Sequence, residues 1–227
     1  MAATPAYALG VSDPAPPPAA RDAIIALVAA HPEFAGIEPA AGPLPWRRRT
    51  PGFAGLLQAI MGQQISNQAA AAIWRRLAAL PGALVPAGLL TLDEATLRGA
   101  GLSRPKVAHA RSLAEAYVDG RLDDARIAGL DDAAAIAAIV AVRGLGPWTA
   151  EVYLLFALER MDVFPAGDIA LAGALAHLRG LPARPSTADL RAEAARWAPH
   201  RSLAARLLWH HWRHITGRPA MDDLPAA

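Results

Sequence analysis

Residues 144–150 read Gly-Leu-Gly-Pro-Trp-Thr-Ala and separate two segments, 131–141 and 147–159, that the sequence predicts to be helices. Gly144 and Gly146 permit a tight turn, because glycine adopts backbone conformations that a side chain blocks. A glycine-rich turn that opens a helix leaves backbone N–H groups directed outward, where they bind phosphate oxygens. The stretch therefore predicts a helical hairpin that holds one DNA strand through backbone contacts. An ordinary corner between two helices is the alternative.

A single acid, Asp168, follows the hairpin in the loop that reads Pro165-Ala166-Gly167-Asp168. It precedes the apolar run 169–175, so a helix N-cap is one interpretation of this aspartate. A carboxylate that faces a cleft is the other. The loop 160–167 spans up to about 27 Å when extended, which permits Asp168 to return beside Trp148.

The rest of the chain reads as short helices with individual caps. We expect a helix over 19–30, an irregular connection over 31–50, and a helix from Thr50-Pro51 to about residue 64, whose apolar face Gln64 extends. Further helix starts are predicted at Ser66, Ser103, Asp131, Ser186 and near His200, and helix ends at Gly120 and Gly217. No segment shows the sustained alternation of apolar and polar residues that is typical of a β-strand, so the sequence predicts an all-α fold.

The composition excludes several classes of site. The 227 residues contain no cysteine, which excludes disulfides, thiolate zinc sites, iron–sulfur clusters and cysteine nucleophiles. No apolar run reaches the roughly 18 residues of a membrane span, and residues 1–20 lack the basic region of a secretory signal. We therefore expect a soluble, cytoplasmic protein. Lys106 is the only lysine. The many arginines suit phosphate binding, although a GC-rich genome explains them equally well.

Several stretches together resemble the helix-hairpin-helix-Gly/Pro-Asp superfamily of DNA glycosylases, and within it the 3-methyladenine-DNA glycosylase II branch. The similarity covers roughly residues 45–215 in family order. It is carried by residues 145–150, by Val163-Phe164-Pro165-Ala166-Gly167-Asp168, by Ile60-Met61-Gly62-Gln63-Gln64-Ile65-Ser66, by Gly101-Leu102-Ser103 with Lys106, and by Trp197-Ala198-Pro199 followed by Arg201-Ser202.

The resemblance implies two helical lobes with a cleft between them. One lobe would combine residues 19–50 with 161–217, and the other would be residues 51–160, which carry the hairpin at 131–159. Residues 1–18 and 218–227 would be tails. Asp168 would lie at the cleft.

The resemblance also assigns the catalytic group and the base pocket. Asp168 would be catalytic, because cleavage of the C1′–N bond builds positive charge on the sugar that a carboxylate stabilises. Trp148 would line the base pocket, where an indole attracts a cationic alkylated purine by up to about 2 kcal/mol. A plain core residue is the alternative for Trp148. His200 would form the second wall, where better-known members carry an aromatic residue, and this departure leaves the substrate range open.

DNA contacts follow from the same resemblance. Gln64 would be the wedge that holds the base out of the stack, with Gln63 as the competing candidate and a plain helix cap as the alternative. Backbone contacts are expected from Arg143, Gly144, Leu145, Gly146, Thr149, Arg49 and Thr50. The resemblance also implies a structural Na⁺ or K⁺ held by the backbone carbonyls of Val140, Val142 and Leu145.

The chain is expected to lack strand-cleaving activity. A glycosylase that also nicks the strand needs an amine for a Schiff base. Members with this lyase activity carry a lysine just after the hairpin, where this chain has Trp148, and the resemblance places Lys106 on a helix surface far from the hairpin.

We therefore expect a monomeric, monofunctional glycosylase that removes 3-methyladenine-type and 7-methylguanine-type bases from duplex DNA and requires no cofactor. Two alternatives are a non-catalytic helix-hairpin-helix DNA-binding module and a glycosylase for deaminated or oxidised purines. His210 and His214 have a spacing that can bind zinc, but no third ligand lies nearby in the sequence, so packing is the favoured role.

Overall fold

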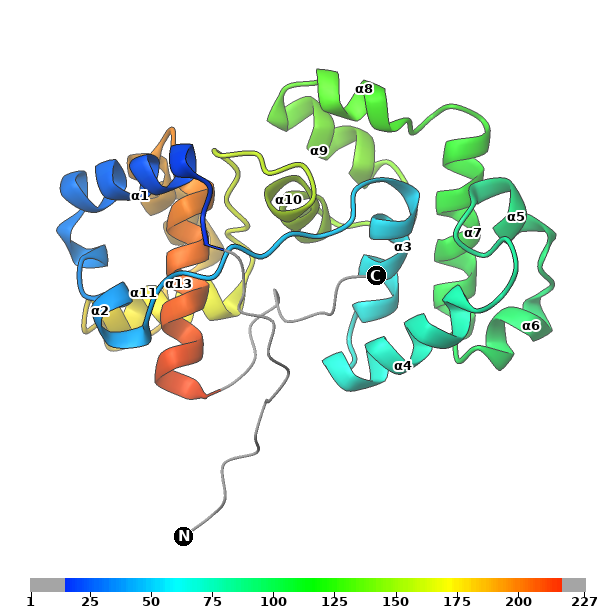
Figure 1. Ribbon diagram of the computed structural model, residues 1–227, viewed down its shortest axis with the longest axis horizontal. Coiled ribbons are helices and arrows are strands. Elements are labelled where there is room, and N and C mark those ends of the chain that lie inside the picture. The colour runs from blue at the N-terminus through cyan, green and yellow to red at the C-terminus, as the bar shows by residue number, and fades with distance from the viewer. Residues whose placement is uncertain (1–14, 218–227) are drawn as a thin grey trace, which may run out of the picture.

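The computed structural model describes residues 15–217, and this part of the chain is all-helical, as predicted (Figure 1). Residues 1–14 and 218–227, most of the expected tails, lie outside the described residues. The α-helices are α1 (Pro18–Ala30), α2 (Ile37–Ala41), α3 (Gly52–Gly62), α4 (Asn67–Ala78), α5 (Pro86–Thr91), α6 (Glu94–Gly99), α7 (Arg104–Val118), α8 (Asp124–Gly129), α9 (Asp132–Val140), α10 (Pro147–Phe156), α11 (Ile169–Leu178), α12 (Thr187–Ala194) and α13 (Arg201–Thr216). Short 3₁₀ helices cover Pro32–Phe34 and Ala195–Trp197.

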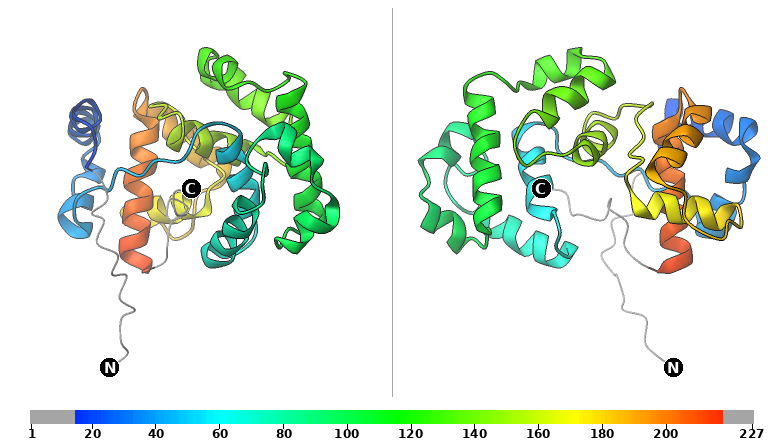
Figure 2. Two further views of the ribbon diagram at one scale, coloured as in Figure 1. Left: turned by 45° about the vertical axis from the view of Figure 1, so that its right-hand side comes forward. Right: turned by 180° about the vertical axis from the view of Figure 1, so that it is seen from behind.

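The helices form two lobes, each around its own apolar core (Figure 2). The first core is built mainly by α3 to α10, and the second by α1, α2 and α11 to α13. Helix α10 serves both cores: Tyr153 and Leu154 lie in the first, and Val152, Leu155 and Phe156 lie in the second. Burial of each such side chain contributes about 1.5–3 kcal/mol. The helix that leaves the hairpin is therefore fixed relative to both lobes.

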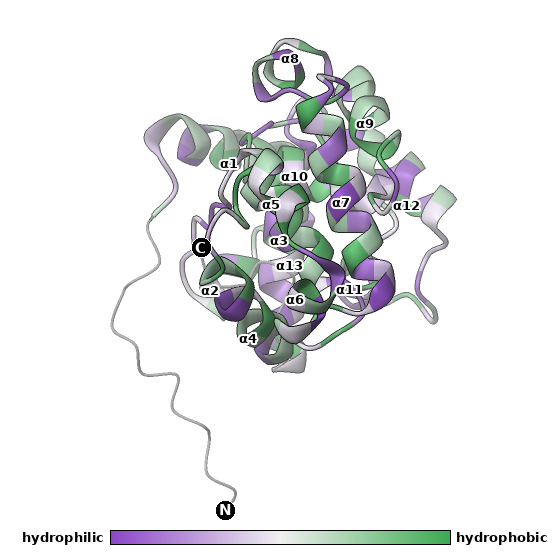
Figure 3. Cartoon of the chain, turned by 90° about the vertical axis from the view of Figure 1, so that its right-hand side faces the viewer, coloured by the Kyte–Doolittle hydropathy of each residue, from purple (hydrophilic) through white to green (hydrophobic). Residues whose placement is uncertain are grey.

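Helix α7 carries apolar residues on one face and polar residues on the other, as its colouring in Figure 3 shows. In α7 the buried side chains include Val107, Ala110, Leu113 and Ala114, at the three- and four-residue spacing of one helix face. No helix in the described part of the chain is long and apolar enough to span a membrane.

The connection over 31–50 is more ordered than the sequence indicates. It contains the 3₁₀ turn Pro32–Phe34 and helix α2 because Phe34 and Ile37 are buried in the second core. Burial outweighs the proline and glycine content here. Beyond α2 the chain crosses in extended form to α3 in the other lobe (Figure 1).

The predicted caps are confirmed at four helix starts. The side chains of Ser66, Ser103, Asp131 and Ser186 accept backbone N–H hydrogen bonds at the starts of α4, α7, α9 and α12. The start of α3 differs, because Pro51 rather than Thr50 is the N-cap residue and no side chain caps it. The Gly52 N–H instead donates to the Tyr153 hydroxyl at 2.8 Å.

The end of α3 also differs from the prediction. The helix ends at Gly62, and Gln63 is the extended C-cap. Gln64 follows with φ +58°, a left-handed conformation that is uncommon for a residue other than glycine. Gln64 therefore does not extend the apolar face of α3.

Candidate active site

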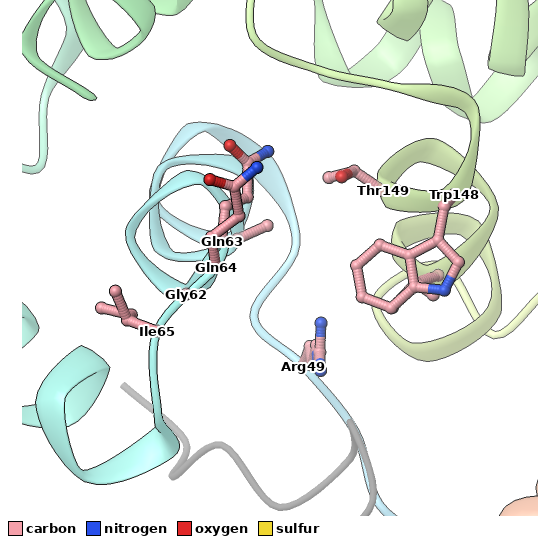
Figure 4. A pocket seen from close by; sticks show the side chains of 9 residues that line it. Arg49, Gly62, Gln63, Gln64, Ile65, Trp148 and Thr149 are labelled. Atoms are coloured by element: carbon pink, nitrogen blue, oxygen red, sulfur yellow. The ribbon is translucent and has the colours of Figure 1, made fainter. Parts of the chain in front are cut away.

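A pocket of about 330 Å³ lies between the connection from α3 to α4 and the first turns of α10 (Figure 4). Trp148 and Thr149 of α10 lie on one side, and the residues 62–65 lie on the other. A site of this size is typical of small ligands. The full lining is Arg49, Ala59, Gly62, Gln63, Gln64, Ile65, Trp148, Thr149 and Val152.

Trp148 connects this pocket to Asp168. The half-buried indole lines the pocket, and its Nε1–H donates to Asp168 Oδ2 at 3.0 Å. The loop after α10 therefore does return beside the hairpin. Asp168 is not itself part of the pocket lining, and its carboxylate contacts the pocket wall through the indole.

Asp168 is also the N-cap of α11, as one interpretation predicted. Its Oδ1 accepts hydrogen bonds from the N–H groups of Ala170 at 2.8 Å and Leu171 at 3.2 Å. Three N–H donors in all, the indole and two backbone groups of α11, bind this carboxylate, and the residue is 6% exposed. Oδ1 thus caps α11, and Oδ2 accepts the hydrogen bond from the Trp148 indole.

The loop that carries Asp168 is held by the start of α13. Arg201 binds Asp162 through two parallel hydrogen bonds of 2.8 Å. The buried Ser202 hydroxyl accepts from the Val163 N–H at 2.9 Å and donates to the Val163 carbonyl at 2.8 Å. In the sequence, Arg201-Ser202 is recognisable only as part of a family signature, because nothing marks contacts between residues 39 positions apart.

The hairpin turn is shaped by Gly144 and by a neighbour from α7. Gly144 has φ +97°, and a Cβ at this position would collide with the imidazole of His109. Gly146 is the extended N-cap residue of α10. Arg143 is exposed, whereas the side chain of Leu145 is buried, which leaves only the backbone of Leu145 for a ligand.

The two glutamines differ in their contacts. Gln63 donates from Nε2 to the Gly144 carbonyl at 2.9 Å, which ties the end of α3 to the hairpin. Gln64 is exposed. Beneath this connection the Lys106 ammonium donates to the Met61 carbonyl at 2.6 Å.

The expected surface position of Lys106 is wrong. The residue is 9% exposed, and burial lowers the pKa of its ammonium group. His109, one turn further along α7, contacts the hairpin at Gly144, so this helix lies directly behind the hairpin. The expectation came from the family resemblance, which did not include the contact between the Lys106 ammonium and the Met61 carbonyl.

Residues 57–200 match the sequence model of the HhH-GPD superfamily of base excision DNA repair proteins. This chain belongs to that superfamily. The curated relatives include DNA-3-methyladenine glycosylase 1 of Schizosaccharomyces pombe, 30% identical over 158 residues that cover 68% of this chain and 69% of the relative. The probable bifunctional transcriptional activator/DNA repair enzyme AlkA of Mycobacterium tuberculosis is 36% identical over 168 residues, which cover 70% of this chain but 33% of the relative.

A solved structure has the same fold. The Schizosaccharomyces pombe 3-methyladenine DNA glycosylase Mag1, in complex with abasic DNA, superposes with a TM-score of 0.74 at 26% identity. The superposition covers 85% of this chain and 95% of that one. The predicted family and the two-lobed helical fold are therefore confirmed.

His200 and Arg49 are two further residues for which the superfamily resemblance implied a role. His200 is not among the lining residues of the pocket, because it is the N-cap residue of α13 and lies near Asp162. Burial alone raises the pKa of Asp162, but the hydrogen bonds of Arg201 and the charges of Arg201 and His200 together hold it below its usual value. Arg49, expected as a DNA-backbone contact, is among the lining residues of the pocket.

Within the described chain, no group of three histidine, cysteine, aspartate or glutamate side chains is arranged to hold a metal ion. His210, half of the pair considered for zinc, bonds through Nε2 to the Gly42 carbonyl at 2.8 Å. Its contact ties α13 to the end of α2, which is the packing role that the sequence favoured.

Proposed function

We propose that this protein is a monofunctional DNA glycosylase that hydrolyses the N-glycosidic bond of alkylated purines, of the 3-methyladenine and 7-methylguanine type, in duplex DNA. The observation that carries the proposal is the hydrogen bond between Asp168 and the pocket-lining Trp148. It joins a carboxylate to an aromatic wall at the edge of a pocket of ligand size. Membership of the repair superfamily and the names of the relatives support the same function.

The chemistry follows from these two groups. As the C1′–N bond breaks, the deoxyribose gains positive charge, which the Asp168 carboxylate stabilises. Water then adds to C1′ and loses a proton, so the products are a free base and an abasic site. An alkylated purine that is already cationic leaves as a neutral base, so no general acid is required. Water is the only co-substrate, and the reaction needs no cofactor.

We propose that the backbone N–H groups of Gly144 and Gly146 and the exposed Arg143 bind phosphates beside the flipped nucleotide. The Leu145 N–H, also expected to bind DNA, donates to the Val142 carbonyl instead. Binding through these contacts falls steeply with salt concentration. Between the two glutamines, Gln64 is the favoured wedge, because Gln63 already donates to the hairpin. The enzyme would act as a monomer on DNA that contains a damaged base.

A Na⁺ or K⁺ ion at the carbonyls of Val140, Val142 and Leu145 is part of this proposal. The Val142 carbonyl accepts a hydrogen bond from the Leu145 N–H at 3.1 Å. A carbonyl oxygen has two lone pairs, so this bond is compatible with a metal contact. Such an ion would stiffen the turn that presents the backbone N–H groups.

We propose that the protein lacks lyase activity because of the environment of Lys106. This single lysine is buried and donates to the Met61 carbonyl, and it does not line the pocket. Trp148 occupies the position where lyase-active members have a lysine. We therefore expect product strands that break only after alkali treatment.

The test compares Asp168→Asn with Asp131→Asn on a duplex that contains one 7-methylguanine. Both aspartates cap a helix, and asparagine caps as well as aspartate, so folding is matched. Asp168→Asn should lower base release at least about 100-fold, as expected for loss of transition-state charge stabilisation. It should keep its affinity for DNA, and Asp131→Asn should behave like the wild type. Equal release by Asp168→Asn and the wild type would contradict the catalytic assignment. A wild type that binds but releases no base would favour the non-catalytic module.

A further inference from the structure

The connection between α3 and α4 has a strained residue in its exposed part. Gln64 lines the pocket and has φ +58°, a left-handed conformation that is unfavourable for a residue with a Cβ. Such a conformation persists only where the surrounding structure determines it, and it is frequent at functional sites. Figure 4 shows this connection across the pocket from Trp148 and Thr149. The contacts on the N-terminal side of Gln64 therefore decide where its side chain lies.

Lys106 holds the end of α3. Its ammonium donates to the Met61 carbonyl at 2.6 Å, and α3 ends one residue later, at Gly62. The last carbonyls of a helix have no partner within the helix, and a cation at this end also complements the helix dipole. Burial of an ammonium is costly unless it is hydrogen-bonded. The buried lysine of α7 therefore caps α3 at the point where the connection to α4 begins.

Gln63 holds the residue directly before Gln64. Its Nε2 donates to the Gly144 carbonyl at 2.9 Å, which joins the connection to the hairpin. His109, one turn after Lys106 on α7, packs so closely against Gly144 that a Cβ on the glycine would collide with its ring. One face of α7 thus contacts both the end of α3 and the hairpin.

This arrangement fixes the distance between two parts of the DNA-binding surface. Under the proposed function, the hairpin binds phosphates and Gln64 fills the space of the flipped nucleotide. Flipping costs unstacking and unpairing energy. A wedge that is already held in its bound place loses little conformational entropy at that moment, so more of the binding energy remains for flipping.

We propose that Lys106 and Gln63 are positioning residues that hold the Gln64 wedge at a fixed place relative to the hairpin before DNA binds. This inference rests on the proposed glycosylase function and deepens its base-flipping step. It also gives a role to two residues that the chemistry of Asp168 and Trp148 does not use.

The experiment follows base flipping by stopped-flow fluorescence on a duplex with 2-aminopurine next to one 7-methylguanine, because 2-aminopurine fluoresces more strongly when it is unstacked. Lys106→Met and Gln63→Met remove the donors and nearly keep the side-chain lengths. Arg111→Met is the matched control. Arg111 also lies on α7 and donates to a carbonyl at the end of a helix, that of Leu92 after α5, but it does not line the pocket.

Each variant is made in the wild type and in Gln64→Ala, and thermal melting checks folding. Lys106→Met and Gln63→Met should each lower the rate of the fluorescence rise about ten-fold, because each loses a hydrogen bond that holds the wedge. In Gln64→Ala the same changes should alter the rate less than about two-fold, because no wedge side chain is left to position. Arg111→Met should leave the rate unchanged in both backgrounds.

A rate within about two-fold of the wild type for a folded variant of either residue overturns the inference. So does a loss that persists in Gln64→Ala, because it makes the contact merely structural or makes Gln63 itself the wedge. Gln63 is only half-buried, so Gln63→Met tests the inference even where Lys106→Met does not fold.

The fluorescence reports unstacking and not bond cleavage, so the two proposals fail separately. A wild type that raises the fluorescence but releases no 7-methylguanine contradicts the glycosylase function, while the variants still decide the positioning roles. A wild type that releases the base, with a fluorescence rise insensitive to Lys106→Met and Gln63→Met, contradicts the inference alone. A wild type that does neither contradicts both.

Discussion

Trp148 has two roles that belong to different parts of its side chain. The aromatic face lines the pocket, and the indole N–H holds Asp168 Oδ2 at 3.0 Å. The backbone of α11 holds the other carboxylate oxygen, so the indole is what directs the remaining oxygen. Stacking with a base requires only the aromatic face of Trp148, whereas the hydrogen bond to Asp168 requires the indole N–H.

The substitution Trp148→Phe separates these roles, because phenylalanine keeps an aromatic face but has no donor. A hydrogen bond to a charged group contributes about 1.5–3 kcal/mol, so the rate of base release should fall about 10- to 100-fold. Single-turnover kinetics at saturating enzyme measure this rate without the binding step. Affinity for lesion-containing duplex should change little. A rate equal to that of the wild type would show that the indole N–H does not position Asp168.

The positions of some site residues could be predicted from the sequence, and those of others could not. The length of the loop permitted the proximity of Asp168 and Trp148, and the family resemblance implied it by placing both residues at the same site. The burial of Lys106 and the pocket position of Arg49 were not. Both depend on contacts with residues distant in sequence, Met61 for the lysine and Phe156 for the arginine.

At the level of the hairpin, two constraints act on Gly144. The backbone has φ +97°, and the His109 ring fills the space where a Cβ would lie. Gly144→Ala should therefore lower the free energy of unfolding by about 2–4 kcal/mol, the sum of backbone strain and overpacking. Urea denaturation measures the loss. His109→Ala in the same chain removes the imidazole ring but keeps the His109 Cβ, which lies 2.6 Å from the added methyl group, and it does not remove the backbone strain. The double variant should therefore recover only part of the stability. Full recovery would show that the backbone conformation costs nothing.

The end of α3 was less predictable than the capped helix starts, although the ends predicted at Gly120 and Gly217 agree with the structure. A start is marked by a local signal, a side chain that accepts an N–H from the next turn, as at Ser66 and Asp131. The end of α3 has no such mark. The helix stops at Gly62 where Gln63 turns to donate to the hairpin 81 residues away. The buried turn around Phe34 was not predicted for a similar reason. The Phe34 ring packs against Trp197, which lies in the same core but is distant in the sequence.

For the molecule as a whole, α10 unites the two lobes and the site. It contributes side chains to both cores, and its first turn lines the pocket. The all-helical class and the lobed fold followed from the periodicity and the family motifs. The site between the lobes is less predictable, since it combines residues from the connection at 49, the end of α3, the hairpin and the start of α11.

The packing of α11 against α13 predicts a pH dependence of stability for the whole protein. His211 is 7% exposed, and its Nε2 lies 3.0 Å from His177 Nδ1. Burial, followed by the nearby charges of His177, His214 and His210, lowers the pKa of His211 to about 4. The unfolded chain therefore binds a proton near pH 6.5 that the folded protein does not bind.

Because the unfolded state takes up the extra proton, the stability from a neutral His211 is present above about pH 6.5 and is lost as the pH falls toward 4. The free energy of unfolding should drop by about 2 kcal/mol between pH 6.5 and 4.5. Urea denaturation across this range gives the slope. His211→Gln should remove most of it, and His31→Gln should not. The comparison between variants cancels the contribution of Glu151 to the pH dependence of stability. Burial raises the pKa of Glu151, so its contribution has the opposite sign to that of His211. Equal slopes for wild type and His211→Gln would show that His211 becomes protonated without opening the interface between α11 and α13.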